Sequence, residues 1–593
     1  MQSTHPRSSV ALFSAVLAAV LITGGLAGPA LATTAAATPT GSAMESVDMT
    51  ADAGSTATGT SELTAATAID TGSGTGPAAD QARTDRPENP TTEDTVGYVA
   101  GYWYDDELPV DDQSDAVVAE DELAPVVYRS MARVERIRNL TFEDEVSVDV
   151  VTRAEYRRTT GDRLANLTAA ERLEQNVGYE ALFTVDRNTA ATDATESMYG
   201  GAVAGYYDPE TDEIVIVSEN PETPELDELT LGHELVHALQ DQRFNLSRLH
   251  GSTQDEDLAT DGLVEGDAKR VELEYKSRCR FDWSCLSPSS ENGNLPADIN
   301  WGIYFTIYQP YSDGPDYVNY LRDQDRGWSA VNAAYDDPPT TTSAVIHPGS
   351  EREPANVSVP DRSSGDWRQL TVDGQVAADT VGETGMVAMF VADAFESSRQ
   401  PVIEQGDFLD GGSQGYDYDH SVTNGWIADR LVVYTNDDAA NASTPSAAGQ
   451  AGYVWRSEWQ SAADAQEFVD GYLQLLESHG AKASDDRQDT FLIDDGGYGG
   501  AYYVELNGST ATIIRAPSAD ELSTVEAGAA PSGDDSLEFP ADDDSDESDT
   551  IPGFGPSVAI GALVLFLFGS RSRIVPNQGR FRSGPHGRND NRD

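Results

Sequence analysis

One pentapeptide carries the side chains of a metal-dependent hydrolytic site. The segment His233-Glu234-Leu235-Val236-His237 follows the pattern H-E-x-x-H. Residues four positions apart lie on one face of an α-helix, so His233 and His237 can offer imidazole nitrogens to one ion. Glu234 would lie beside the open metal position, where a carboxylate takes the proton of water attacking a carbonyl carbon. We therefore expect zinc-dependent hydrolysis of peptide bonds with Glu234 as general base.

The third metal ligand is expected from a second helix. Glu265 is followed by Gly266 and Ala268, and such small residues let two helix backbones approach closely. A glutamate–zinc bond of about 2.0 to 2.2 Å requires that approach. The competing ligand is His250, which lies too far after His237 for the compact arrangement of three histidines. The predicted metal ligands are thus His233, His237 and Glu265.

At these residues the sequence resembles the gluzincin type of zinc metallopeptidase, in which a downstream helix supplies a glutamate. More narrowly, it is similar to secreted HExxH proteins that carry an EGDA segment, here Glu265 to Ala268. The likeness covers residues 201–348 and extends more weakly to Pro517. It implies an α+β, zincin-like core with a hairpin or sheet, an HExxH helix and a glutamate helix. Lys269 replaces an aspartate common in the family, so Asp267 or Asp261 is expected to hold a ligand histidine.

A further catalytic residue is expected downstream of the glutamate helix. In a gluzincin-like site a histidine or tyrosine can hold the oxyanion that forms during attack. His347, in the segment Ile346-His347-Pro348, is the candidate for that role. The alternative for a lone histidine is a capping or packing position.

The sequence also predicts the helices and strands that position the H-E-x-x-H motif. Thr223 before Pro224 predicts an N-cap and first turn for the motif helix. Residues 202–207 and 213–217 predict a hairpin, whose edge either accepts an extended substrate as a further strand or binds no ligand. Residues 115–137 predict a helix interrupted at Pro125.

The C-terminal half carries no recognisable chemistry and is expected to serve as scaffold, substrate wall or partner surface. Its expected elements are a helix over 376–395 containing Glu383, strands over 425–434 and 452–459, a helix over 461–476 opened by a Ser461/Asp464 capping box, and a hairpin turning at Asn507-Gly508. Together with the core, these elements predict an α+β protein.

The only two cysteines are Cys279 and Cys285, which follow the glutamate segment closely. In an exported protein this spacing favours a disulfide over free thiols or a metal site. The short loop limits its entropic contribution to about 2 to 3 kcal/mol.

The strongly negative net charge of the chain indicates a high-salt environment. The formal net charge is −65, and Lys and Arg together number 37 against 102 Asp and Glu. Self-repulsion on that scale is tolerable only when salt screens it, because the Debye length falls to about 3 Å in molar salt. The composition is typical of an extreme halophile, and it excludes nucleic acid as a partner because an acidic chain repels phosphate.

Both ends of the chain carry signals for export. Residues 1–32 predict a secretory signal peptide, with a retained N-terminal anchor as the alternative. Residues 33–95 are poor in large apolar side chains and predict a disordered stalk or pro-segment. We expect the metallopeptidase core over 96–350, a C-terminal lobe over 351–525 and an acidic linker over 526–550.

The segment 551–573 contains Pro552-Gly553-Phe554-Gly555, an apolar run and two arginines, followed by a basic tail over 574–593. That order resembles the PGF-type sorting signal of haloarchaeal surface proteins. The resemblance implies an archaeosortase as processing partner and a lipid anchor, whereas an intact segment would be a membrane span. The predicted function is a zinc endopeptidase tethered at the cell surface; the alternative is a surface or adhesion protein with a structural metal.

Overall fold

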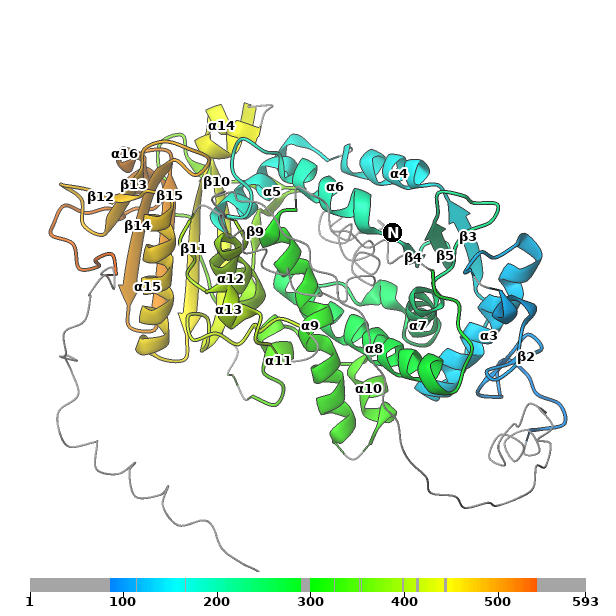
Figure 1. Cartoon of the computed structure of the whole chain (residues 1–593). Coiled ribbons are helices and arrows are strands. Elements are labelled where there is room, and N and C mark those ends of the chain that lie inside the picture. Colours follow the sequence, from blue (N-terminus) through cyan, green and yellow to red (C-terminus); the bar gives the residue numbers. More distant parts are fainter. Residues whose placement is uncertain are drawn as a thin grey trace, which may run out of the picture. The chain divides into compact units, whose positions relative to one another are not determined.

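The computed structural model describes residues 86–113, 115–165, 167–288, 299–324, 326–350, 352, 355–396, 399–411, 415–441 and 445–540 (Figure 1). The predicted signal peptide, nearly all of the predicted stalk, the sorting signal and the basic tail lie outside these residues. Within them, no helix has both the length and the apolar character that crossing a membrane requires. The described residues all belong to one compact unit, which ends at Pro540.

Helices and strands both contribute substantially, which confirms the predicted α+β class. The helices are α3 (Glu120–Arg138), α4 (Arg153–Ala165), α5 (Ala169–Ala181), α6 (Ala191–Ala202), α7 (Glu228–Phe244), α8 (Gln254–Phe281), α9 (Trp301–Asp323), α10 (Trp328–Ala334), α11 (Thr342–Ile346), α12 (Gly382–Val391), α13 (Gln405–Phe408), α14 (Asp437–Asn441), α15 (Ala462–Ser478) and α16 (Ala519–Val525). The strands are β1 (Tyr98–Val99), β2 (Tyr102–Trp103), β3 (Ser147–Val151), β4 (Gly205–Asp208), β5 (Glu213–Val217), β6 (Arg368–Gln369), β7 (Thr371–Val372), β8 (Gln375–Val376), β9 (Ala378–Asp379), β10 (Trp426–Thr435), β11 (Gly452–Trp459), β12 (Lys482–Ala483), β13 (Thr490–Ile493), β14 (Gly500–Asn507) and β15 (Thr510–Ala516).

The largest sheet is antiparallel, with the order β12-β13-β14-β15-β11-β10-β6 and with β9 also paired to β10. Along β11, Tyr453 and Trp455 face one cluster of buried side chains, whereas Val454 between them faces another. Successive side chains of a strand point to opposite faces of the sheet, so β11 is buried on both faces. Helix α15 packs against the first face and Leu522 of α16 against the second, so both faces are covered (Figure 1).

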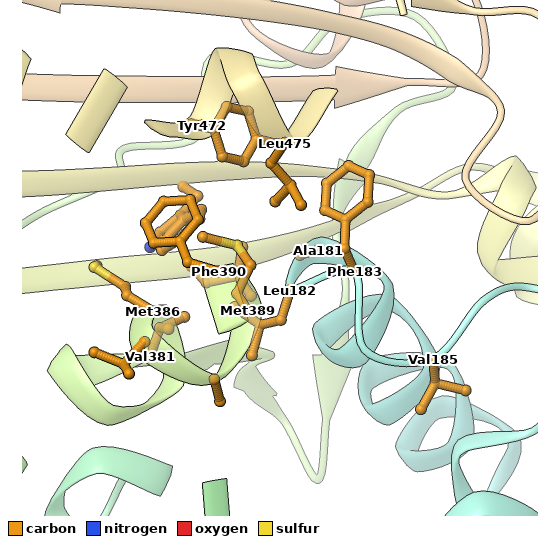
Figure 2. Close-up of a cluster of buried hydrophobic side chains, with 14 of the residues drawn as sticks. Ala181, Leu182, Phe183, Val185, Val381, Met386, Met389, Phe390, Tyr472 and Leu475 are labelled. Carbon is orange, nitrogen blue, oxygen red and sulfur yellow. The ribbon is translucent and has the colours of Figure 1, made fainter. Parts of the chain in front are cut away.

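The hydrophobic cluster on the α15 side joins segments far apart in sequence. Figure 2 shows Phe183 after α5, Met389 and Phe390 of α12, and Tyr472 of α15 meeting in one buried group. The same cluster includes Leu258 of α8 and Tyr311 of α9, so a continuous core extends from the large sheet to the glutamate helix. The buried apolar side chains of α7 belong to a second cluster, shared with α3.

A smaller sheet lies next to α7. Strand β5 pairs in parallel with β3 and antiparallel with β4, in the order β3-β5-β4. The predicted hairpin of β4 and β5 is therefore confirmed, as is the hairpin of β14 and β15 around Asn507-Gly508. The capping box at Ser461 and Asp464, which opens α15, is also present.

Two predicted helices have different bounds. The break predicted at Pro125 is wrong, because α3 continues through that residue and buries Val126 and Met131 beyond it. The helix predicted over 376–395 begins only at Gly382, after β8 and β9. The Asp429 carboxylate accepts the amides of Val381 and Gly382 at 3.0 Å each, which holds the helix start.

Candidate metal centre

Helix α7 begins at Glu228, and the side chain of Asp227 caps it by accepting a backbone amide of the first turn at 3.1 Å. The predicted start at Thr223 is wrong. The carbonyl of Pro224 accepts a hydrogen bond from the amide of Val118, which keeps this segment extended instead of helical. The helix nevertheless contains the whole H-E-x-x-H motif, as expected.

The first residue of α7 is tied to three other parts of the fold. Glu228 is fully buried and accepts hydrogen bonds from the hydroxyl of Tyr275 at 2.7 Å and from the amide of Leu286 at 3.0 Å. Arg129 and Arg133 of α3 pair with the same carboxylate. A buried carboxylate with this many donors is satisfied as an ion. It therefore anchors the start of the motif helix to α3, to α8 and to the loop after α8.

The glutamate helix α8 contacts α9 backbone to backbone. A Cβ added to Gly266 would lie 2.3 Å from the carbonyl oxygen of Gly314, and one added to Gly314 would lie 2.5 Å from a backbone oxygen of α8. Only glycine allows this distance. The small residue beside Glu265 therefore allows a close contact between helices, as expected, and the helix that it contacts is α9.

Three side chains converge between α7 and α8. The Oε2 atom of Glu265 lies 3.2 Å from Nε2 of His233 and 3.4 Å from Nε2 of His237. One donor atom from each residue lies within 4.8 Å of the others, and all three residues are buried. This is the set predicted from the sequence. It could hold a metal ion, because two imidazole nitrogens and a carboxylate oxygen are common ligands of divalent transition metals.

The other nitrogen of each imidazole has a partner of its own. Nδ1 of His233 lies 3.2 Å from the Glu272 carboxylate, and Nδ1 of His237 lies 2.9 Å from Oε1 of Gln240. Gln240 is itself oriented because its Nε2 donates to the carbonyl of Val264 at 2.9 Å. Both partners are acceptors, so each Nδ1 carries a proton and each Nε2 is left to face Glu265. There Nε2 either donates a proton to the Glu265 carboxylate or, once that proton is lost, offers its lone pair to a metal ion.

The predicted support of a ligand histidine by Asp267 or Asp261 is wrong, since Glu272 and Gln240 occupy both Nδ1 positions. Asp267 instead forms a buried ion pair with Arg138, at 2.9 Å, and accepts the hydroxyl of Tyr335 at 2.8 Å. This residue faces α3 and α10 because it lies on a different side of α8 from Glu265. Two positions along a helix differ by about 200° in direction.

The charges in the site favour a cation between the three donors. Burial alone would lower the pKa of His233, but the Glu265 and Glu272 carboxylates raise that pKa above its usual value. Burial alone would raise the pKa of Glu265, but the two histidines hold it well below the usual value. In addition, Nε2 of His237 has no hydrogen-bond partner among the described residues. A raised histidine pKa beside a lowered glutamate pKa is typical of a buried site with excess negative charge, which a proton or a metal ion balances.

Glu234 lies beside the ligands and does not join them. Its Oε2 accepts the amide of Tyr207, in β4, at 3.0 Å, whereas its buried Oε1 has no hydrogen-bond partner among the described residues. Burial raises the pKa of Glu234 well above its ordinary value, and the Glu265 carboxylate raises it further. The residue is thus oriented by one oxygen and retains a second oxygen for proton transfer.

Tyr311 was not predicted, yet it lies in the site. Its ring is nearly parallel to that of His233, with centroids 6.4 Å apart, and it hydrogen-bonds the Glu265 carboxylate. Burial, with the nearby Glu265, raises the pKa of Tyr311 well above its usual value, so the phenol keeps its proton. The signal in the sequence was its spacing, because Tyr311 precedes Gly314 by three residues and shares its helix face.

The other residues singled out in the sequence, His347, His250 and the two cysteines, are not among the three clustered donors. His347 follows α11, with Nε2 2.9 Å from Glu383 and Nδ1 3.8 Å from Asp419. His250 is exposed in the loop before α8 and is not one of the three clustered donors. The predicted disulfide between Cys279 and Cys285 is present, and it closes the loop that delivers Leu286 to Glu228.

Comparison with known proteins yields one match. A family model described as Domain of unknown function (DUF8575) matches residues 368–526. No curated protein and no solved structure matches the chain. The matched stretch contains the eight-stranded sheet with α12, α15 and α16, and it leaves the three clustered donors outside.

Proposed function

We propose that the chain is a zinc-dependent metallopeptidase that hydrolyses peptide bonds, with a zincin-like core formed by the β3-β5-β4 sheet, α7 and α8. The observation that carries this proposal is the convergence of His233, His237 and Glu265, with both histidine tautomers set by other residues. Structural zinc sites are normally closed by four protein ligands, whereas catalytic sites use three and leave a position open.

The residues present fit zinc. The donor set is two imidazole nitrogens and one carboxylate oxygen, and Nε2 of His237 lacks any other partner among the described residues. Glu265 and Glu272 add negative charge around the histidines, which a divalent cation balances. When bound, zinc supplies Lewis acidity, which polarises a carbonyl group and lowers the pKa of water to about 7.

The chain's own groups then have distinct tasks. Oε1 of Glu234 receives the proton of the attacking water and passes it to the leaving amine, while the Tyr207 amide holds Oε2 in place. The hydroxyl of Tyr311, which keeps its proton, donates to Glu265 in this structure. When Glu265 binds a metal ion, this hydroxyl would be released to donate to the oxyanion that forms on the carbonyl oxygen. Strand β4 is an edge strand of the described sheet and offers main-chain groups to an extended substrate.

Replacing Glu234 tests the catalytic assignment. Glu234→Gln should keep zinc at the wild-type ratio but lower casein hydrolysis in molar salt by about 10²- to 10⁴-fold, because the base is lost while the ligands remain. His237→Ala is the contrasting variant and should lose zinc and activity together. Elemental analysis after dialysis measures the metal. A wild-type chain that binds zinc yet hydrolyses no peptide would support the alternative, a surface or adhesion protein with a structural metal.

A second pair of variants tests the third ligand. Glu265→Ala should empty the site, whereas His250→Ala should retain wild-type zinc because His250 is exposed and apart from the cluster. The reverse result would transfer the ligand role to His250.

We further propose export and attachment at the cell surface, on the basis of the terminal segments 1–32 and 551–573. Mass spectrometry of membrane-extracted protein should find no peptide beyond Gly555 and an added lipid mass at the new C-terminus, with an archaeosortase as the processing enzyme. Recovery of peptides from the 574–593 tail in the mature protein would contradict processing and indicate an intact span.

A further inference from the structure

A cleft lies one turn of α8 away from Glu265, at Asp261. Its cavity of about 160 Å³ is walled by apolar side chains, among them Leu258, Ile307 and Leu431. It lies where α5, α8, α9 and the β7–β10 strands meet. The cleft contains neither His347 nor any metal donor, so it is distinct from the site described above.

Two helices run from this cleft to the metal donors. On α8, Asp261 lines the cleft and Glu265, four residues later, belongs to the donor cluster. On α9, Ile307 lines the cleft and Tyr311, again four residues later, contacts Glu265. One helical turn rises about 5.4 Å, and neighbouring residues of an extended peptide are about 3.3 Å apart. An extended substrate whose carbonyl lies at the metal donors and whose chain runs towards Asp261 and Ile307 brings a neighbouring side chain to the near end of the cleft, and Asp257 lies one further turn along α8.

The charged side chains that line the cleft are all acidic. Five carboxylates line it, and the lining contains no Lys, Arg or His. Asp257 is the most buried of them, at 6% exposure. Its Oδ1 accepts the amide of Gly251 at 2.7 Å, but its buried Oδ2 has no hydrogen-bond partner among the described residues. Leaving a buried carboxylate oxygen unpaired is costly, and a cation entering the cleft would supply the missing partner.

Burial raises the pKa of Asp257 to about 6. The carboxylate is therefore largely ionised at neutral pH, when a cation can pair with it.

We propose that this cleft is a specificity subsite that takes a lysine or arginine side chain of the peptide substrate, next to the bond that is cleaved. The inference rests on the proposed peptidase function and names its substrate class. The apolar walls suit the methylene stem of such a side chain, and the unpaired Oδ2 of Asp257 pairs with its charged end. A neutral or acidic side chain would leave Oδ2 of Asp257 unpaired.

Fluorogenic peptides that differ at one residue, bearing Arg, Lys, norleucine or Glu on either side of the cleaved bond, test the subsite in molar salt. For the wild-type chain, kcat/KM with Arg or Lys should exceed that with norleucine by about tenfold or more at one position, because the ion pair is buried and poorly screened. Asp257→Asn should bring this ratio towards one, because it removes the carboxylate that pairs with the cation. Asp366→Asn, an exposed site away from the cleft, is the matched control and should keep the ratio.

A binding measurement separates this inference from the proposed function. In the Glu234→Gln background, calorimetry should show tighter binding of the Arg peptide than of the norleucine peptide, and Asp257→Asn should remove the difference. Cleavage of neutral and cationic peptides at equal rates, with equal binding, would overturn the subsite and leave the peptidase intact. If the wild-type chain binds zinc and cleaves none of the peptides, the proposed peptidase function is wrong. The calorimetric preference for the Arg peptide would then still show whether the cleft binds a cationic side chain.

Discussion

The carboxylate of Glu272 lies 3.2 Å from Nδ1 of His233 and accepts two hydrogen bonds from Lys269, at 2.9 and 3.0 Å. Glu272 follows Glu265 by seven residues, which is about two helical turns, so both carboxylates occupy the same side of α8. One helix therefore supplies a metal donor and also orients a donor of the other helix. Lys269, at the position where the family resemblance led us to expect an aspartate, supports this second carboxylate instead.

Removing that support should weaken metal binding. Glu272→Ala is expected to lower zinc affinity by about 10- to 100-fold, because His233 loses the acceptor that fixes its tautomer. Competition with a chromogenic chelator measures the change. The matched control is Glu274→Ala on the same helix, since Glu274 pairs with Arg270 and Arg278 near the surface and does not contact the metal donors. Equal affinities for the two variants would contradict a supporting role for Glu272.

The contact between α8 and α9 should not tolerate a side chain. Gly266→Ala places a Cβ 2.3 Å from the Gly314 carbonyl oxygen, so the helices must separate, at a cost of about 1 to 3 kcal/mol in the free energy of unfolding. Zinc content should fall as well, because Glu265 moves with α8. Chemical denaturation in molar salt and elemental analysis report both effects. Gly406→Ala is the control, because a Cβ there meets no atom within 4 Å. A Gly266→Ala variant as stable as this control would refute the close contact.

Stability should depend on pH through Asp255, whose Oδ1 accepts the Thr342 amide at 3.0 Å and hydroxyl at 2.6 Å. Burial, with the nearby Asp429 and Glu383 carboxylates, raises its pKa from the ordinary 3.8 to about 8. Because the folded chain holds this proton more tightly than the unfolded chain, the contribution of Asp255 to stability falls as pH rises from about 4 to 8.

Asp255→Asn cannot ionise and keeps an oxygen for Thr342. The Tm of the variant relative to wild type should therefore increase between about pH 5 and about pH 9. A difference in Tm that is constant over this range would show that Asp255 titrates normally.

Salt should stabilise the whole chain. The net charge of −65 makes carboxylates repel one another across the surface, and at about 0.1 M salt the Debye length of about 10 Å lets that repulsion reach neighbouring groups. The Tm should therefore fall as salt is reduced from molar concentration to about 0.1 M. Scanning calorimetry in KCl measures this, with sucrose at equal osmolarity as the control for non-ionic effects. A Tm independent of KCl would reject the halophilic interpretation.

Local chemistry explains what could be predicted from the sequence. The H-E-x-x-H spacing allows both histidines to face one ion only on a helix, and the glycine beside Glu265 indicated a close helix contact. The hairpin of β14 and β15 was predictable because Asn507-Gly508 suits a tight turn. In each case neighbouring residues carry the whole signal.

Contacts between distant segments explain the errors. The start of α7 was misplaced because the Pro224 carbonyl is used by Val118, about one hundred residues earlier, and Asp227 caps the helix instead. Tyr311 was missed because its place beside His233 depends on where α9 crosses α8. Spacing along one helix gives a side chain's direction but not the identity of the helix that it meets.

The glycine contact also has a consequence for how the site can change over generations. Every amino-acid substitution of Gly266 or Gly314 adds at least a Cβ, so none preserves the helix distance. Chains that descend from this one and keep the site are therefore expected to keep both glycines along with Glu265, whereas chains with an accidental H-E-x-x-H pentapeptide are under no such constraint. The glycine pair therefore serves as a marker of descent that can separate true relatives from chance matches in genome sequences.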